Sequence, residues 1–171
     1  MTRKYIQNGT AIVARDYTDE DLEKIANAPE NQRPIFLNET DQSVLAFIAA
    51  QPSAATLMWG RIKNERDRRK EAGGTKVGTK WFHSDTSSRI QFLGLVLMGA
   101  NLPVNIQWKT MDGTFVAMTP VLAGQIFSAS AAADMAIFAA AEAHKQTMQT
   151  TTDPTAYDYL AGWPAVYGDL L

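Results

Sequence analysis

The chain reads TKVGTKWFHSDTSSRIQFLGLVLMGANLPVNIQWKTMDG over residues 75–113. Its first nine residues predict a tight two-stranded hairpin, and the apolar run at 90–102 predicts a helix buried on most faces by its own domain or by another subunit. A second hairpin, 105–118, turns through an Asp-Gly pair that supplies the positive φ such a turn needs. Almost the whole stretch therefore indicates scaffold. The residues expected to form this scaffold are Gly78, Trp81, Phe82, His83, Asp85, Ile90, Trp108, Asp112 and Gly113.

The segments on either side of this stretch predict two longer helices. One begins at Ser53 and ends before two glycines at 73–74, and we expect its charged residues at 61–70 to be mostly solvated. The other begins at the Thr-Pro pair 119–120, since threonine caps a helix and proline suits its first position, and continues to about Gln149. Its apolar stripe is rich in alanine, which predicts close packing against another element.

The first fifty residues predict a small separate module. Asn8-Gly9 favours a hairpin, Thr18 caps a short helix, 43–50 favours another helix, and 30–40 is the expected irregular connector. The chain is thus predicted to be α+β: a mainly helical domain with two small β-hairpins and a long C-terminal alanine-rich helix, plus the N-terminal module. The predicted divisions are the module at 1–52, the domain at 53–149 and an aromatic tail at 150–171.

Composition narrows the class of protein. The 171 residues are 46% apolar and 20% charged, as in a globular domain, and the net charge of -2 creates no global field that favours nucleic acid. The chain has no cysteine, which excludes disulfides and cysteine-ligated zinc. The N-terminus lacks the apolar run of a signal peptide, and the window 90–102 is shorter than the roughly 20 residues that span a bilayer. We therefore expect no export signal and no membrane insertion.

Residue chemistry gives little support to catalysis. His83, Ser84 and Asp85 form the one cluster with three catalytic residue types, but neighbours on a strand point to opposite faces, whereas a catalytic relay draws its groups from separate segments. Asp85 as a helix cap, with His83 packing beside it or bonding the backbone, explains the same residues. A metal site would need His83 and His144 to be joined by carboxylates such as Asp85 or Asp134, and none of these has ligand spacing. We expect no enzyme activity, no cofactor and no metal.

Two other regions are candidates for partner binding. The run 66–70 holds the clustered cations that phosphate contacts require, but Glu65, Asp67 and Glu71 interleave with it. This interleaving favours a solvated helix face, or a salt-bridged contact with an acidic partner, over nucleic acid. The aromatic tail supplies four candidate interface residues that could equally belong to a core. These are Tyr157, Tyr159, Trp163 and Tyr167.

Three motifs, taken in order, resemble a known family. They are KVGTKWFHSD at 76–85, SRI at 88–90 and WKTMDGT at 108–114. Together they are similar to a domain family of uncharacterised chemistry found in tail, tail-fibre and fibre-assembly proteins of tailed bacteriophages. The resemblance covers roughly residues 62–143, and it implies a structural or assembly factor rather than an enzyme.

The resemblance implies a non-enzymatic protein made in the host cytoplasm and located in the virion tail. It would bind tail-fibre or baseplate proteins, either as an attachment component that stays in the particle or as a tail-fibre assembly chaperone that leaves. The apolar helix at 90–102 and the alanine stripe suit contacts between copies, so we expect a homo-oligomer, with a trimer as the hypothesis. The alternatives of another class are a small hydrolase of cell-wall or surface glycans and a nucleic-acid-binding module.

Overall fold

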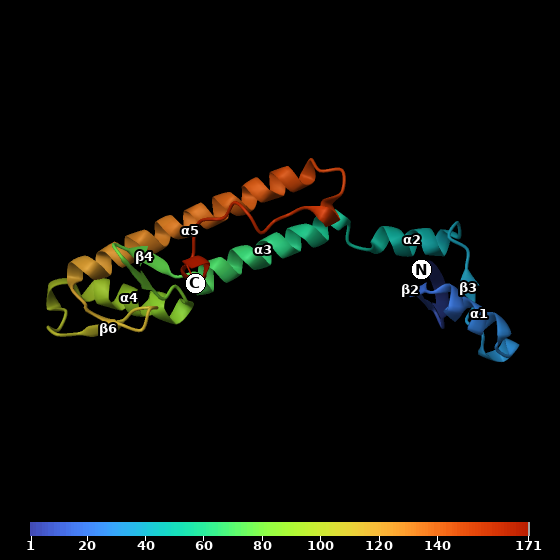
Figure 1. Cartoon of the computed structure of the whole chain (residues 1–171), viewed down its shortest axis with the longest axis horizontal. Coiled ribbons are helices and arrows are strands. Elements are labelled where there is room, and N and C mark those ends of the chain that lie inside the picture. Colours follow the sequence, from blue (N-terminus) through green and yellow to red (C-terminus); the bar gives the residue numbers. More distant parts are fainter. Residues whose placement is uncertain (171) are drawn as a thin grey trace. The chain divides into compact units, whose positions relative to one another are not determined.

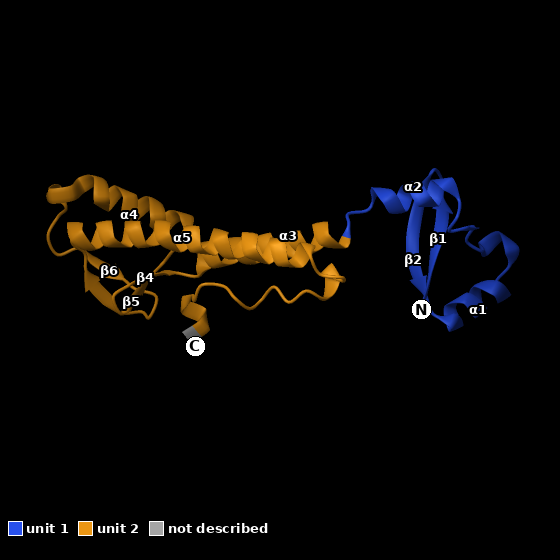
Figure 2. Ribbon diagram, turned by 90° about the horizontal axis from the view of Figure 1, so that it is seen from above, with its two compact units in different colours: residues 1–53 blue, residues 54–171 orange. Residues whose placement is uncertain are grey.

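The computed structural model describes residues 1–170 and divides the chain into two compact units, Met1–Ser53 and a second unit from Ala54 onwards (Figure 2). The architecture is α+β, as predicted, with small hairpins and a long C-terminal helix. The tail that we expected as a separate region lies within the second unit.

Unit 1 contains β1 (Thr2–Asn8), β2 (Ala11–Tyr17), α1 (Asp19–Asn27), the 3-10 helix η1 (Glu30–Gln32), β3 (Phe36–Leu37) and α2 (Gln42–Ala50). Unit 2 contains α3 (Ala54–Ala72), β4 (Thr75–Val77), β5 (Lys80–Phe82), α4 (Thr86–Met98), η2 (Gly99–Asn101), β6 (Gln107–Lys109), β7 (Phe115–Ala117), α5 (Pro120–Gln149), η3 (Pro154–Ala156) and η4 (Tyr167–Leu170).

Unit 1 is built on a three-stranded antiparallel sheet with the order β2-β1-β3. Gly9 has a φ of 62° and lets β1 turn into β2, which confirms the predicted Asn-Gly hairpin. Thr18 and Asp21 form a reciprocal capping box at the start of α1. The segment 30–40 was wrongly expected to be irregular throughout, because it contains η1 and β3. A strand of two residues carries too little alternation to be recognised from sequence.

The sheet of unit 1 has one face packed on a helix. Tyr5 of β1 meets Phe47 of α2 edge-on, with ring centroids 6.3 Å apart. Val44 of α2 is fully buried, and Tyr17 at the end of β2 is 8% exposed. Among the residues of unit 1, all of which are described, no other side chain is buried.

Unit 2 is arranged along α5, its longest helix (Figure 1). Helix α4 packs with the hairpins on the first part of α5, and α3 packs on the later part. Each contact has its own apolar cluster. The first cluster is Phe82, Phe92, Leu95, Leu102, Met118, Ala123 and Ile126. The second is Met58, Ile62, Ala141 and Met148.

The ends of the unit 2 helices follow the sequence signals. The Thr119 hydroxyl accepts a hydrogen bond from the Leu122 amide at 3.1 Å, and Pro120 is the first residue of α5, as predicted. Helix α3 stops at Ala72, and Gly74 after it has a φ of 77°. Helix α4 begins at Thr86, directly after the predicted Asp85 cap. It ends at Met98, before the predicted end at Pro103, because the chain continues as the 3-10 helix η2.

Candidate interaction surface

The segment between β5 and α4 is a structural joint and not a catalytic relay. The buried Ser84 hydroxyl accepts a hydrogen bond from the Gly74 amide at 2.9 Å and donates one to the Glu71 carbonyl at 3.3 Å. Asp85 caps α4 by accepting from the Ser88 amide at 2.9 Å, as predicted. Its hydrogen bonds with Ser88 hold the pKa of the Asp85 carboxyl below its usual value. His83 is exposed, and within the described residues no hydrogen bond links it to either neighbour.

An ion pair and side-chain hydrogen bonds join the turns of the two hairpins. Lys80 donates to Asp112 at 2.8 Å and to the Thr114 hydroxyl at 2.8 Å. The other Asp112 oxygen accepts from Thr110 and Thr114, so these contacts lower the pKa of the Asp112 carboxyl, with the Lys80 bond first among them. The Trp81 carbonyl accepts a hydrogen bond from the Met111 amide at 2.9 Å, which connects β5 to the turn of the second hairpin. The predicted motif at 108–114 therefore shapes the fold.

The remaining scaffold residues are divided between turns, core and surface. Gly78 and Gly113 have φ values of 61° and 83° in the two turns. Phe82 is buried, Trp81 is 9% exposed, and the half-buried Trp108 lies 4.6 Å from the Phe92 ring. Ile90 differs, because 65% of it is exposed.

Arg89 connects three parts of unit 2 at one point. Its guanidinium forms two parallel hydrogen bonds with the Asp134 carboxylate of α5, at 2.6 and 2.8 Å. It also donates to the Lys70 carbonyl at the end of α3 and to the Ser84 carbonyl just before α4. Both side chains of the Arg89–Asp134 pair are only 24% exposed. Such bidentate pairs fix direction as well as distance, so α3, α4 and α5 are held in register here.

Helices α4 and α5, which the Arg89–Asp134 pair joins, expose apolar side chains on the surface of unit 2. Helix α4 exposes Ile90, Leu93 and Leu97, which share one face because their spacing is three and four residues. Helix α5 exposes Phe127 and Phe138 on the face that carries Asp134, by the same spacing rule. We name this surface the α4–α5 face. Its members are Ile90, Leu93, Leu97, Phe127 and Phe138.

A shallow hollow and two cations complete the α4–α5 face. Phe127 and Asp134 line the hollow together with Arg89, where α4 meets α5. Two cations of α3 lie over Phe138 on α5: the Arg66 guanidinium is 4.9 Å and the Lys70 amine 5.7 Å from the centre of the Phe138 ring. The face is therefore apolar with a basic margin. Its chemistry suits packing against another protein surface, since exposed apolar patches rimmed by polar groups mark interaction sites.

The expectation that the apolar helix would be buried on most faces is wrong for the chain by itself. Phe92 and Leu95 are the buried residues of α4, whereas Leu97 is 77% exposed. The reason is that α5 and the hairpins cover one side of α4 only. Helix α5 is similar, because its exposed positions between Val121 and Ala139 carry no charge. Length and composition alone would let α5 cross a membrane, and 22% of its most apolar window is buried.

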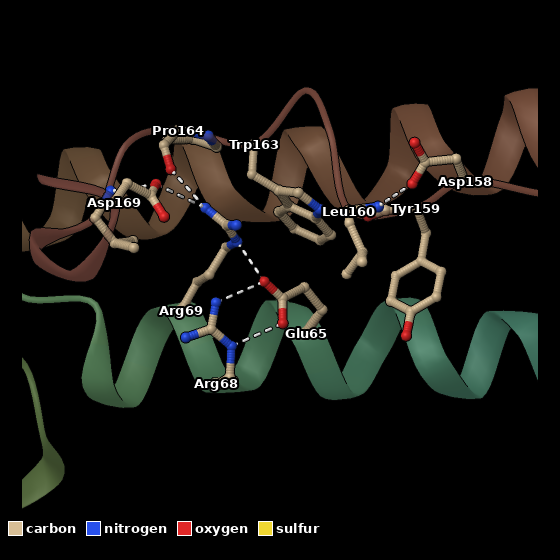
Figure 3. A network of polar contacts seen from close by, with 10 residues as sticks. Glu65, Arg68, Arg69, Asp158, Tyr159, Leu160, Trp163, Pro164 and Asp169 are labelled. Carbon is tan, nitrogen blue, oxygen red and sulfur yellow. Dashed lines mark hydrogen bonds and ion pairs between the residues drawn. The ribbon is translucent and has the colours of Figure 1, made fainter. Parts of the chain in front are cut away.

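The aromatic tail lies across α3 and α5 and is fixed by Arg69 (Figure 3). Arg69 donates to Glu65 at 2.6 Å and to the Pro164 carbonyl at 3.1 Å, and its guanidinium lies 5.5 Å from the Trp163 ring centre. Arg69 is 8% exposed, so the expectation that it would be mostly solvated is wrong. The physical reason is that the tail covers this face of α3. Arg68 beside it pairs with Glu65 and stays half-exposed.

The tail aromatics are half-buried by their own chain. Trp163 donates its indole N–H to the Tyr159 carbonyl at 2.7 Å and lies 4.9 Å from the His144 ring. Tyr157 shares a 2.8 Å hydrogen bond with His144, and Tyr167 meets the Trp81 ring edge-on. These contacts assign the four candidate interface residues to packing within unit 2. In the described part of the chain, no group of three potential metal ligands comes together.

The Arg89–Asp134 pair is the feature that sequence reasoning missed. A signal for it existed, because Arg89 is the single charged residue of α4 and Asp134 the single charged residue of α5 before Glu142. Opposite charges that stand alone in apolar helices are expected to pair, since an isolated charge is costly to bury. We had considered Asp134 only as a metal ligand.

The family comparison fits this arrangement. The chain belongs to the family described as Domain of unknown function (DUF4376), which matches residues 53–161, more than half of the chain. The match begins at the start of unit 2 and includes both helix contacts, the two hairpins and most of the tail. No curated protein and no solved structure matches the chain.

Proposed function

We propose that this protein is a non-enzymatic bacteriophage tail protein that acts through protein–protein contacts, as a structural or attachment component near the tail fibre or baseplate. The observation that carries the proposal is the α4–α5 face, where large apolar side chains stay exposed on a unit that already has two apolar cores. The tail assignment itself rests on the resemblance of the motifs at 76–85, 88–90 and 108–114.

Physical chemistry supports contact rather than catalysis. Among the residues singled out from the sequence, Ser84, Asp85 and Asp112 each already serve a hydrogen bond within the scaffold. The α4–α5 face, in contrast, offers apolar area without a partner inside the described chain. Burial of such area stabilises association by roughly 25 cal/mol per Å² before the entropic cost of binding. The role that this favours is a binding module. The resemblance adds that this module is made in the host cytoplasm and retained in the virion tail.

Self-association through the α4–α5 face is part of the proposal. The exposed small residues of α5 allow another helix to approach closely, and the hypothesis is a trimer. Sedimentation equilibrium of the purified chain would then give a whole multiple of three chains of 18.8 kDa each. Leu97→Glu places a charge on the face and should lower the mass. Leu57→Glu is the matched control, because Leu57 is 58% exposed on α3 and does not belong to the face.

The decisive experiment is mass spectrometry of purified particles of the phage whose genome encodes this protein. Stoichiometric presence of the 18.8 kDa chain supports a tail component. Absence from particles, with co-purification of fibre protein from lysates, supports the alternative, an assembly chaperone. Absence from both would contradict the proposal.

Rivals of another class have separate tests. A glycan hydrolase should release sugars from cell walls or surface glycans and lose that activity in His83→Ala. A nucleic-acid-binding module should retain DNA or RNA in a salt-dependent manner. A membrane-inserted α5 should carry the protein upwards with liposomes in a flotation gradient. We expect no activity, no nucleic-acid binding and no flotation.

A further inference from the structure

The outer edge of β2 presents unpaired backbone groups. The Gln7 amide of β1 donates to the Ile35 carbonyl beside β3, so this residue points away from β2. Backbone groups alternate in direction along a strand, and the register pairs Gln7 with Ile12. It follows that Ile12, Ala14 and Asp16 direct their N–H and C=O groups outwards. Since β2 is the terminal strand of the sheet, no strand within the described chain accepts them.

This edge has only part of the usual protection against pairing, namely the charged side chains of Arg15 and Asp16. Natural edge strands are shortened, bulged, or interrupted by lysine or proline. Strand β2 is seven residues long, pairs with β1 in an unbroken register, and contains neither lysine nor proline. Val13 on this strand is 43% exposed. The edge is therefore open for an added strand, and its sequence restricts which strand fits.

A second copy of β2 fits in one antiparallel register. Pairing Ala14 with Ala14 of the other copy places Ile12 opposite Asp16 and Val13 opposite Arg15. All three outward-pointing residues are then paired, which gives about six main-chain hydrogen bonds. Shifting the centre to Arg15 or to Asp16 would place like charges opposite each other, which destabilises a sheet. Shifting it to Val13 leaves Asp16 without a partner strand residue.

Helix α2 adds apolar surface to the same edge. Helix α2 contacts β2, and its Phe47 contacts Tyr5 on β1. Ile48 and Leu45 lie on the side of the helix away from Phe47. Leu45 is 53% exposed and Ile48 is 42% exposed. Strands in a sheet lie about 4.8 Å apart, so pairing two β2 strands brings the two α2 helices, each of which contacts its own β2, towards each other. Helices pack at 8–10 Å, and α2 carries no charged residue that would oppose this contact.

We propose that unit 1 dimerises by antiparallel pairing of β2 with β2 of a second copy, centred on Ala14, with the two α2 helices packed beside each other. The result is a continuous six-stranded sheet. The inference goes beyond the proposed function and does not depend on the tail assignment. The contact is two-fold, so it gives two chains where it acts alone and six where the proposed threefold contact of unit 2 also forms.

The first test compares two substitutions at Ala14 in the full chain. Ala14→Pro removes an outward-pointing N–H that β1 does not use, and proline is tolerated at such edge positions. Ala14→Ser keeps the N–H and serves as the matched control. Sedimentation velocity should show an even number of chains for the wild type and Ala14→Ser, and half that number for Ala14→Pro. An unchanged mass for Ala14→Pro, or a wild type with an odd number of chains, would overturn the proposal.

The second test reads the register and does not need the proline variant to fold. The chain has no native cysteine, so single cysteines report single positions. A hydrogen-bonded pair has Cα atoms about 5.5 Å apart, within the range of a disulfide. Ala14→Cys should form a covalent dimer under mild oxidation, whereas Val13→Cys should not, because its partner is Arg15. Cross-linking of Val13→Cys alone, or of neither variant, would reject this pairing and leave the edge for a strand of another protein.

Discussion

Unit 1 and unit 2 satisfy their side chains in different ways. In unit 1 only Tyr17 and Val44 are buried among its residues, all of which are described, whereas unit 2 contains two apolar clusters. In unit 1 the Arg33 side chain bonds the Ala28 carbonyl five positions away, and the Arg3–Asp16 ion pair joins the neighbouring strands β1 and β2. In unit 2 side-chain hydrogen bonds reach 100 positions, from Arg69 to Asp169. Side-chain contacts between distant segments therefore hold unit 2 together to a greater extent than unit 1.

The largest expected effect is separate unfolding of the two units. Unit 1 buries too little apolar surface to match the stability of unit 2, so it should unfold at lower urea concentration. All four tryptophans, Trp59, Trp81, Trp108 and Trp163, lie in unit 2. Far-UV circular dichroism should therefore show an early loss of structure that tryptophan fluorescence does not detect. A single transition with both probes would break the comparison. Raising the protein concentration should delay the early step if unit 1 dimerises.

Removal of a core ring should affect unit 2 alone. Phe92 is 1% exposed and contacts both Phe82 and Trp108, so Phe92→Ala should lower the free energy of unfolding of unit 2 by about 3–5 kcal/mol. Met98→Ala is the control on the same helix, because Met98 is 49% exposed and does not belong to the α4–α5 face, and it should cost under about 0.5 kcal/mol. The urea midpoint measured by tryptophan fluorescence reports both changes. An equal shift in the early transition would show that the units are coupled.

Breaking the Arg89–Asp134 pair should have a smaller effect. Asp134→Ala leaves the Arg89 guanidinium partly buried with half of its partners, and we expect a loss of about 2 kcal/mol in unit 2. Arg89→Ala should cost at least as much, since it also removes the bonds to two backbone carbonyls. The double variant should cost clearly less than the sum of the single ones, as a double-mutant cycle would measure. Additive effects would mean that the two groups do not interact in solution.

The smallest effect concerns the tail and acid pH. The hydrogen bond from Arg68, followed by that from Arg69, holds the pKa of Glu65 below its usual 4.5. A lowered folded pKa contributes stability that is present above 4.5 and is lost as the pH falls through the folded value. Below pH 4.5 the tail should therefore loosen, which cleavage at Tyr157 or Tyr159 by pepsin, a protease active in acid, would detect. Glu65→Gln should make cleavage less pH-dependent and cost about 1 kcal/mol at neutral pH. A pH profile unchanged by Glu65→Gln would assign the loosening to another group.

Local chemistry made much of the fold predictable. Asn8-Gly9, the Asp85 cap, the Asp-Gly turn and the Thr119-Pro120 start depend on a few neighbouring atoms, and the structure contains each of them as predicted. The length of α5 was predicted to its last residue for the same reason, because its periodic pattern runs unbroken between a cap and a change of composition.

The candidate surface was less predictable, because burial depends on segments far apart in the chain. The apolar pattern of α4 predicts that the helix packs against another surface, but not whether that surface belongs to the same chain. Ile90 and Leu97 are exposed because α5 covers the opposite side of α4. The tail aromatics show the reverse. Nothing near Trp163 in sequence predicted that Arg69 would hold it against α3.

The sequence by itself determined where helices and turns begin and end, since capping hydrogen bonds and backbone strain act over four or five residues. The absence of cysteine also excluded disulfides and cysteine-ligated zinc. Only the tertiary structure decided which apolar side chains remain exposed, that Arg89 pairs with Asp134, and that β2 ends its sheet with free backbone groups. These properties depend on which distant segments of the chain pack against α5 and β1. A local sequence pattern does not contain that information, because it describes only neighbouring residues.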